Sequence, residues 1–478
     1  SAGDAYRPNF NLSFNDADDA AELKSFLMDY SGGAKSVHAP QSSEARERRS
    51  VVKAALAADD DHEPSSDQID AELDFVTRKL FRDLKKWTFD VFEFNKKTNG
   101  RPLYFIGLTL FKYHGLIDAF DIPEETLKSF LNAVENGYRD NLYHNKIHAA
   151  DVTQSVNFFL TTGGLGELLT PLELMAMILA ALVHDLDHVG FNNAFLINTE
   201  DPLALLHNDK SVLENHHIHQ TYTLLRNKEH NFLCNVEKAQ LKELREMIIE
   251  LILDTDFSKH FDLLGQFKAK HTSETGLDME KKAEKLLLLG IALKCADVGH
   301  TAKAHALHLA WTERITGEFF LQGDEEKRRN LPVSPFMDRE TTVIAKSQTG
   351  FIEFLVLPLY QLWVDQFQSA QICLDNVQAN LAYWQEVAAQ GEEETANKRK
   401  KHKHRRVAST KDGSESNSSK KKGSSSESRR QTGSTDDSKR VKKSSLSVKK
   451  SSTSESRSGG NSSGTNPLPR RSKSSEKL

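Results

Sequence analysis

Histidines are concentrated in one part of this sequence. Eight of the 19 histidines lie between His144 and His219, although histidine is neither a strong helix former nor a typical core residue. His144 and His148 are four residues apart, so on a helix or in its first turn they share one face and can act at one site. Clustered imidazoles of this kind indicate a metal-binding site.

Carboxylates adjoin these histidines at the ends of two apolar runs. Residues 174–183 lead into His184 and Asp185, and residues 286–293 are soon followed by Asp297. A buried helix that ends in such side chains presents them to a cleft. Two imidazoles with two carboxylates suit Zn²⁺ or a related divalent ion, and a spare oxygen of Asp185 can bridge to Mg²⁺ or Mn²⁺. The spacing excludes an H-E-x-x-H zinc protease and a cysteine-based site.

Six short segments carry a family resemblance. They are residues 143–152 (YHNKIHAADV), 184–193 (HDLDHVGFNN), 213–217 (LENHH), 294–297 (KCAD), 318–324 (EFFLQGD) and 347–352 (SQTGFI). In composition and order they resemble the signature segments of the class I cyclic nucleotide phosphodiesterases, a group within the HD-type metal phosphohydrolases. The resemblance extends over about residues 75–385 of the sequence.

The resemblance implies a two-metal site. The ligands of the tighter metal, usually zinc, would be His148, His184, Asp185 and Asp297. Asp185 would also reach a second metal, usually magnesium, for which Mn²⁺ is an alternative. His144 corresponds to the residue that gives a proton to the leaving group.

The resemblance also implies groups around the metals and around the substrate. His188, Glu214 and His217 would orient waters bound to the metals. Gln348 and Phe351 match the glutamine that hydrogen-bonds the purine edge and the aromatic ring that stacks on its face. The expected reaction is hydrolysis of 3′,5′-cyclic nucleotides, cAMP, cGMP or both, to nucleoside 5′-monophosphates.

The sequence departs from the family pattern at two positions. Val189 stands where the family usually has proline, and Phe257 ends a segment, Asp-Thr-Asp-Phe, that usually reads Ala-Thr-Asp-Met. Selectivity between adenine and guanine stays open, because a glutamine can present either its carbonyl or its amide, so Gln348 serves both bases. His300 is a candidate for tuning it, in a segment most similar to the calcium/calmodulin-regulated, dual-specific branch.

Two other functions are compatible with parts of this pattern. Another HD-type nucleotidase would use the same metals, but it would need neither residues 347–351 nor His144. A scaffold that binds cyclic nucleotide without cleaving it would be expected to have lost a ligand or the acid, and all of these residues are present. The residues therefore favour a metal-dependent 3′,5′-cyclic-nucleotide phosphodiesterase in cyclic nucleotide signalling.

Helical elements are expected to position these residues. From about residue 67 to 390 the apolar spacing is helical nearly throughout, and strand-like alternation between tight turns is missing, so we predict an all-α domain. Asp121 and Thr170 each precede a proline and a first-turn acid, which predicts two helix starts. The run 174–183 is too short for a bilayer-spanning helix and is predicted to be a core helix.

Composition predicts two appendages to the domain. Residues 1–66 read as a regulatory or linking arm, and the basic-apolar stretch 46–58 is either a solvated helical turn or a helix that docks on a regulatory protein such as calmodulin. Residues 395–478 hold 24 serines and 24 Lys/Arg against 7 Asp/Glu, with no aromatic ring other than histidine, which predicts a disordered basic tail. Within the tail, residues 398–406 (KRKKHKHRR) are expected either to be a solvated charge run or to contact import receptors, anionic membranes or polyanions.

Charge and cysteines predict the setting in which the chain works. Residues 1–394 carry 39 Lys/Arg against 61 Asp/Glu, which argues against general nucleic-acid binding by the main body. Three cysteines without C-x-x-C spacing argue against a disulfide framework and favour a reducing compartment. No secretory signal pattern and no transmembrane segment stand out, so we expect a cytoplasmic protein, with nuclear or peripheral membrane location through the tail as alternatives.

Overall fold

Helices make up the regular structure of this protein. The computed structural model describes residues 82–412, with side chains described for residues 82–393, and this part of the chain contains helices and no strand. The all-α prediction is confirmed for these residues. The predicted arm, residues 1–66 with its stretch 46–58, lies outside the described residues.

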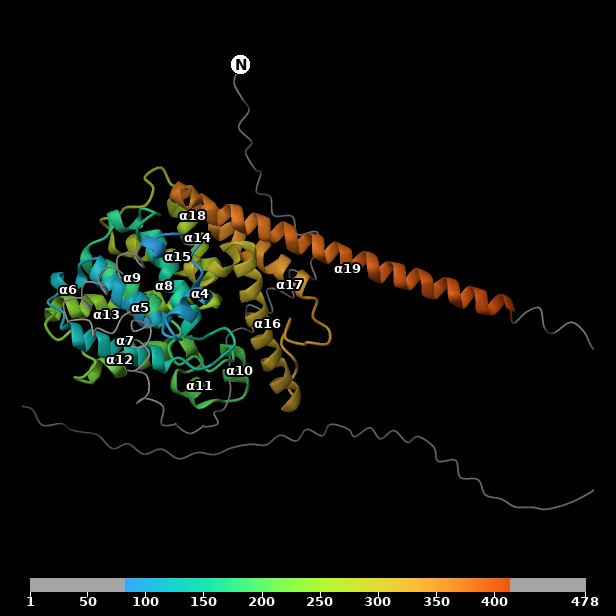
Figure 1. The fold of residues 1–478 in the computed structure, drawn as a ribbon, viewed down its shortest axis with the longest axis horizontal. Helices are drawn as coiled ribbons and strands as arrows, with labels where there is room; N and C mark the ends of the chain where they lie inside the picture. The colour runs from blue at the N-terminus through green and yellow to red at the C-terminus, as the bar shows by residue number, and fades with distance from the viewer. Residues whose placement is uncertain (1–81, 413–478) are drawn as a thin grey trace, which may run out of the picture. The chain divides into compact units, whose positions relative to one another are not determined.

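The helices follow one another with short connections (Figure 1). The α-helices are α4 (Val91–Lys97), α5 (Pro102–Tyr113), α6 (Leu116–Ala119), α7 (Glu124–Gly137), α8 (Lys146–Leu160), α9 (Pro171–Val183), α10 (Asn193–Asn198), α11 (Pro202–Leu206), α12 (Val212–Arg226), α13 (Lys238–Leu253), α14 (His260–His271), α15 (Lys282–Asp297), α16 (His305–Arg328), α17 (Ile344–Phe351), α18 (Leu357–Gln366) and α19 (Gln371–Asp412). Four short 3₁₀ helices are η2 (Leu165–Leu168), η3 (Phe257–Lys259), η4 (Gly299–Ala302) and η6 (Gln368–Ala370), and η5 (Ile352–Val356) is a π-helix.

Helix α9 forms the centre of the core. Every residue from Met175 to Val183 is buried, and the helix packs closely against α8 and α13. A helix that is apolar on all sides loses the most water-exposed surface when neighbouring helices enclose it. The predicted core helix at 174–183 is confirmed, and in the described residues no helix is long and apolar enough to span a membrane.

The two predicted helix starts differ in outcome. Thr170 caps α9 with a capping box, in which Thr170 Oγ1 accepts from the Glu173 backbone N–H at 3.4 Å and Glu173 Oε2 accepts from the Thr170 N–H at 2.8 Å. The helix start predicted after Asp121 is confirmed, since α7 begins at Glu124 with two acids in its first turn, but the predicted cap is wrong, because the cap residue is Pro123. Asp121 instead takes a φ of 47° and accepts hydrogen bonds from the Asn235 amide.

Helix α16 connects distant parts of the domain. Its Gln322 is paired with Asn192, and the carboxylate of Glu326 accepts hydrogen bonds of 2.6 Å from both the backbone N–H and the hydroxyl of Ser334. Gly323 lets the chain approach closely, because a Cβ there would lie 1.9 Å from the carbonyl oxygen of Met337. The helix thereby holds the segment that leads into α17.

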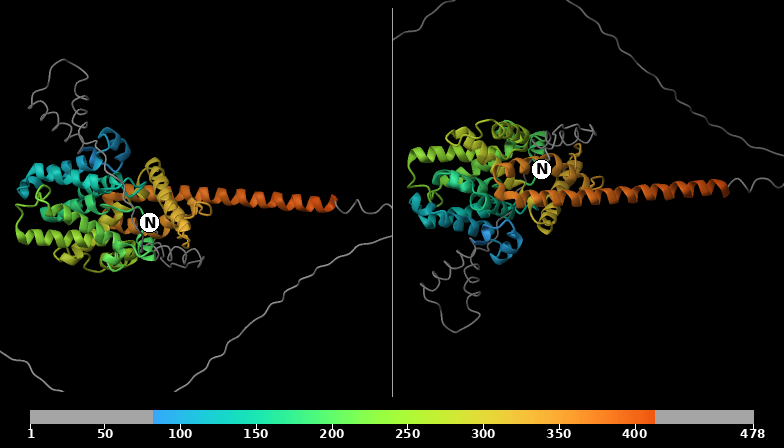
Figure 2. Two further views of the ribbon diagram at one scale, coloured as in Figure 1. Left: turned by 90° about the horizontal axis from the view of Figure 1, so that it is seen from below. Right: turned by 90° about the horizontal axis from the view of Figure 1, so that it is seen from above.

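The C-terminal helix runs further than predicted. We predicted that order ends at about residue 395, but α19 continues to Asp412, and Figure 2 shows it as one uninterrupted helix. Helical backbone therefore continues beyond the predicted boundary at about residue 395, and the remainder of the predicted tail, residues 413–478, lies outside the described residues. Cys234, Cys295 and Cys373 are free thiols, as expected.

Candidate metal centre and active site

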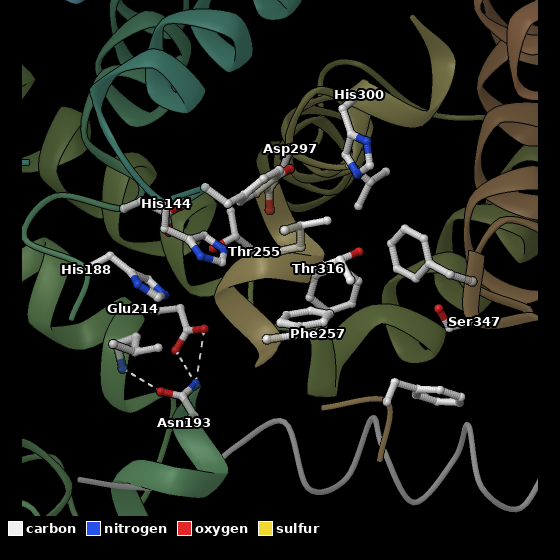
Figure 3. Close-up of a pocket in the computed structure, with 18 of the residues that line it drawn as sticks. His144, His188, Asn193, Glu214, Thr255, Phe257, Asp297, His300, Thr316 and Ser347 are labelled. Carbon is white, nitrogen blue, oxygen red and sulfur yellow. Dashed lines mark hydrogen bonds between the residues drawn. The ribbon is translucent and has the colours of Figure 1, made fainter. Parts of the chain in front are cut away.

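One large cleft gathers most of the residues that the sequence singled out. It encloses about 1210 Å³ of space that opens to solvent, and Figure 3 shows its lining side chains. Eight of the ten predicted site residues line it: His144, Asp185, His188, Glu214, His217, Asp297, Gln348 and Phe351. The other two, His148 and His184, lie buried behind Asp185 and Asp297.

The four predicted metal ligands meet at the ends of three core helices. His148 lies in the first turn of α8, where the Asn145 side chain caps the helix. His184 is the C-cap residue of α9, Asp185 follows it directly, and Asp297 is the last residue of α15. Because α8, α9 and α15 pack against one another, their ends converge.

The spacing of three ligand atoms, those of His148, His184 and Asp297, fits a tetrahedral ion. The Nε2 atoms of His148 and His184 are 3.3 Å apart, and they lie 3.2 and 3.4 Å from Asp297 Oδ1. The same two nitrogens lie 3.6 and 3.4 Å from Asp185 Oδ2. Donor atoms around a tetrahedral metal with bonds of about 2.0–2.1 Å are about 3.3–3.4 Å apart. These residues can therefore hold a divalent cation.

The histidine ligands are oriented by their surroundings. His184 is fully buried, and its Nδ1 lies 3.0 Å from the carbonyl oxygen of Ala181. A hydrogen on Nδ1 that is donated to this carbonyl leaves Nε2 with its lone pair directed at the other ligands. The tautomer that a metal requires is thereby the one that α9 favours.

A second group of polar side chains lies beside Asp185. His217 donates from Nδ1 to the Leu186 carbonyl at 2.7 Å, and its Nε2 lies 3.6 Å from Asp185 Oδ1. Burial lowers the pKa of His217 to about 4, so its Nε2 is an acceptor that faces an acceptor. Such a pair favours a water or a cation near both atoms. The predicted role of His188, Glu214 and His217 around a second metal stays a prediction.

Glu214 is held by an amide. Asn193 Nδ2 donates to both carboxylate oxygens of Glu214 at 3.2 and 2.9 Å, while Asn193 Oδ1 accepts from the Leu213 backbone N–H (Figure 3). Burial and the neighbouring charge of Asp256 raise the pKa of Glu214 to about 8, and the Asn193 amide acts in the opposite direction.

His144 is paired with a carboxylate that the sequence did not single out as a site residue. Its Nδ1 lies 2.5 Å from Glu318 Oε1, and Glu318 Oε2 accepts from the backbone N–H groups of Tyr143 and His144 at 2.7 and 3.1 Å. Burial opposes the charge on His144, but the Glu318 carboxylate outweighs it and raises the pKa of His144 to about 9. The pairing with Glu318 therefore favours the protonated form of His144, whose side chain lines the cleft.

The far part of the cleft is aromatic and contains unpaired polar atoms. Phe351 lies 6.3 Å from Phe257, measured between ring centres, and both rings line the cleft with Gln348 and His300. Gln348 is 8% exposed, and its Oε1 has no hydrogen-bond partner among the described residues. Of the two departures from the family pattern, Phe257 belongs to the cleft, whereas Val189 packs in a separate apolar cluster.

Sequence reasoning missed the partners of two site residues. Glu318 opens a signature segment and Asn193 ends another, so both were visible as motif residues. Their roles were not, because Glu318 is 174 residues from His144 and Asn193 is 21 residues from Glu214. Only the folded chain shows which carboxylate meets which histidine.

The helical domain brings together two histidines and two aspartates, a histidine paired with a carboxylate, and an aromatic cleft. This arrangement is typical of a metal-dependent hydrolase. Comparison with known proteins gives the family. Residues 143–377 match the family model described as 3′5′-cyclic nucleotide phosphodiesterase. Residues 143–377 therefore form a domain of the class I cyclic nucleotide phosphodiesterases.

Curated relatives agree with this assignment. The chain is 38% identical over 315 residues to two proteins of Drosophila melanogaster, "3',5'-cyclic-AMP phosphodiesterase, isoform F" and "3',5'-cyclic-AMP phosphodiesterase, isoforms N/G". Each alignment covers 64% of this chain, but only 48% and 32% of the two relatives. The chain thus matches half or less of the length of these relatives.

Proposed function

We propose that this protein hydrolyses 3′,5′-cyclic nucleotides to nucleoside 5′-monophosphates. The observation that carries the proposal is the close pairing of His144 with Glu318 beside the group of His148, His184 and Asp297, whose ligand atoms lie near one another. A cyclic phosphodiester needs both, because its phosphate is anionic and its leaving oxygen is a poor leaving group without a proton. The family match supports the same reaction class.

We propose the identity of the metals from the chemistry of their ligands. His148, His184, Asp185 and Asp297 would hold Zn²⁺, since mixed nitrogen and oxygen ligands at tetrahedral spacing suit this ion. Asp185 would also contribute to a site for Mg²⁺ or Mn²⁺, around which His188, Glu214 and His217 would hold waters. Bound divalent ions supply neutralisation of the phosphoryl oxygens and a lowered pKa of an attacking water.

The residues of this chain supply the proton for the leaving group. His144 carries its proton at neutral pH because Glu318 lies 2.5 Å from its Nδ1. Transfer of that proton to the ribose 3′ oxygen prevents the expulsion of a free alkoxide, a contribution typically worth about 10²–10⁴-fold. Glu318 is itself fixed by two backbone N–H groups, so the imidazole keeps its orientation when its charge changes.

The aromatic end of the cleft would bind the base. We propose that Phe351 stacks on the purine and that Gln348 hydrogen-bonds its edge, for which the unpaired Oε1 is the support. The relatives named above are cyclic-AMP phosphodiesterases, which favours cAMP as a substrate. Hydrolysis of cGMP is proposed as well, because the amide of Gln348 can present a donor or an acceptor.

One assay tests the proposal and its alternatives. The full chain is incubated with cAMP, cGMP and non-cyclic nucleotides in Mg²⁺, and nucleoside 5′-monophosphate is quantified. We expect product from the cyclic substrates and none after treatment with a strong chelator. Binding of cyclic nucleotide without cleavage would identify a non-catalytic scaffold instead, and cleavage of non-cyclic nucleotides alone would identify another HD-type nucleotidase.

The setting of the enzyme is proposed from the sequence. We propose a cytoplasmic enzyme, regulated by a protein that binds residues 1–66 and located through the basic residues 398–406, which would contact import receptors, anionic membranes or polyanions. The support is the charge of the tail, 24 Lys/Arg against 7 Asp/Glu. Salt-sensitive binding of the tail to anionic vesicles or to an import receptor would locate this interaction.

A further inference from the structure

The turn after the ligand Asp297 is held from outside the cleft. This turn is η4, which carries His300 into the wall of the cleft. The side chain of His300 is buried, and its Nδ1 has no hydrogen-bond partner among the described residues. The position of His300 therefore depends on what fixes the backbone of η4.

Two asparagines of α19 hydrogen-bond that backbone. Asn380 Nδ2 donates to the carbonyl oxygens of Thr301 at 2.9 Å and of Lys303 at 3.0 Å. Asn376, one turn earlier on the same face of α19, donates to the Ala302 carbonyl at 2.8 Å. Three successive carbonyl groups are thus bound by one stripe of a single helix.

The stripe continues to a tryptophan. Trp384 is one turn beyond Asn380, and its Nε1 donates to His308 Nε2 at 2.7 Å. The ring of His308 lies 5.5 Å from the ring of His300 at an interplanar angle of 15°, so the two rings are stacked. Helix α19 therefore contacts both the backbone around His300 and the His308 ring that stacks on the His300 ring.

The first residues of the described domain contact the same turn. Trp87 Nε1 donates to the Ala302 carbonyl at 2.7 Å, and its ring lies 4.3 Å from the ammonium of Lys303. Lys303 is fully buried, and its charge is paired with Asp151 at 3.1 Å and hydrogen-bonded to Gln154 at 2.9 Å. The two ends of the described domain converge on η4.

Asn380 is buried like a core residue although its side chain is polar. It is 2% exposed, and its Oδ1 lies 3.2 Å from His305 Nδ1 while its Nδ2 serves η4. A buried amide is costly unless it is hydrogen-bonded, and an apolar side chain would pack α19 without that cost. The partners of Asn380 therefore point to a role in orienting the segment 301–305.

We propose that Asn380 is a positioning residue for the substrate cleft: it fixes η4 so that His300 stays in the cleft wall, and Trp87 fixes the same turn from the upstream side. The inference rests on the proposed function, since the cleft is taken as the cyclic nucleotide site. Helix α19, at least to Trp384, then belongs to the catalytic unit.

The first test separates KM from kcat in the full chain. Asn380→Leu keeps the size of the side chain and removes both donors, and Gln378→Leu on the exposed face of α19 is the matched control. We expect KM for cyclic nucleotide to rise roughly fivefold to thirtyfold, with kcat within about twofold of the parent, with unchanged metal content and with an unaffected control. A merely structural role would lower the fraction of active enzyme, which reduces kcat and leaves KM unchanged.

The second test does not depend on hydrolysis. Hydrogen exchange of the amides at residues 299–303, followed by mass spectrometry, should be faster in Asn380→Leu than in the control. Trp87→Phe, which removes the indole N–H and shortens the ring, should show the same change and serves if Asn380→Leu does not fold. Unchanged exchange in these variants, or faster exchange with unchanged KM, overturns the proposal. A parent protein that cleaves no cyclic nucleotide overturns the proposed function instead, and the exchange result still decides whether Asn380 holds η4.

Discussion

The two ends of the cleft differ in how many of their polar atoms already have partners within the protein. At the metal end, ligand atoms from three helices lie 3.2 to 3.6 Å apart, and the carboxylate that orients His144 is fixed by two backbone N–H groups. At the nucleotide end, buried Gln348 Oε1 and His300 Nδ1 have no hydrogen-bond partner among the described residues. The side chains at the metal end are thus fixed by contacts within the fold, whereas the polar atoms at the other end keep bonding capacity for a ligand.

The difference follows from the elements that carry each end. The ligands stand at the ends of α8, α9 and α15, helices of 13 to 16 residues that pack together in the core. Gln348 stands on α17, which has eight residues and continues directly into the π-helix η5. Single π-turns inside helices are frequent at functional sites.

The largest effect is expected at the metal end. Replacing Asp297 with alanine should abolish hydrolysis and tightly bound metal together, because a site of four ligands rarely keeps its ion with one removed. Elemental analysis of the purified protein measures the loss, and His148→Ala should behave in the same way. Asp262→Ala, at an exposed carboxylate, is the control. Full metal occupancy in an inactive Asp297→Ala protein would show that this residue is no ligand.

A large but selective loss is expected for His144→Ala. A leaving-group acid contributes to the transition state and little to ground-state binding, so kcat should fall roughly 10²–10⁴-fold with metal content unchanged. A substrate with an activated leaving group that needs no proton should lose much less. An equal loss on both substrates would contradict the role of His144 as proton donor.

The nucleotide end should respond in KM. Gln348→Leu removes the polar atoms that we assign to the purine edge, so KM for cAMP and cGMP should rise roughly tenfold to hundredfold while kcat changes less. Steady-state kinetics on both nucleotides provide the measurement, with Gln390→Leu on exposed α19 as control. A lower kcat with unchanged KM would show that Gln348 acts in catalysis and not in binding. The proposed difference between the two ends of the cleft would then be wrong.

Glu318→Gln should change the pH profile. The pKa of His144 is raised to about 9, above its ordinary value, so the proton is held at neutral pH and lost as pH rises through about 9. Without the Glu318 carboxylate, burial favours the neutral imidazole, and the alkaline fall of kcat/KM should move toward neutral pH. We expect a loss of about tenfold at pH 8 and a smaller loss at pH 6. An unchanged alkaline limb would show that another group sets it.

The smallest effect is expected from the tail. Removal of residues 395–478 keeps the Lys346–Glu392 ion pair of 2.6 Å and the α19 stripe through Trp384. The value of kcat/KM should stay within about twofold, because the predicted site residues all precede the cut. Binding of the chain to anionic surfaces should decrease, and that binding should weaken with salt. A loss of most activity at physiological salt would show that the tail acts on the catalytic domain.

Those candidate site residues could be predicted that stand out by their own neighbours in the sequence. His184 and Asp297 stand at the C-terminal ends of helices, which can be recognised where an apolar run stops, and His148 can be recognised by its spacing of four residues from His144. Glu318 was not assigned, because its pairing with His144 exists only after α16 packs beside the segment before α8. A single sequence shows residue types and spacing, but it does not show contacts across 174 residues.

Polar residues that serve the interior of the fold could not be recognised from the sequence. Asp151, Gln154 and Asn157 of α8 are buried and bind Lys303 or the upstream backbone, although their chemistry alone predicts a solvated face. Asp121 did not cap α7, because its side chain bonds Asn235 from another part of the chain. The helical backbone of α19 continues to Asp412, which the composition of residues 395–412 did not indicate.

The buried ammonium of Lys303 gives the protein a built-in chemical reporter. An amine must be exposed and unprotonated to react with acylating reagents, and Lys303 is fully enclosed between Asp151, Gln154 and the ring of Trp87. In mass-spectrometric footprinting it should be among the last lysines to acquire a label. Its labelling rate would then measure how often the upstream segment detaches from the domain, without any substrate present.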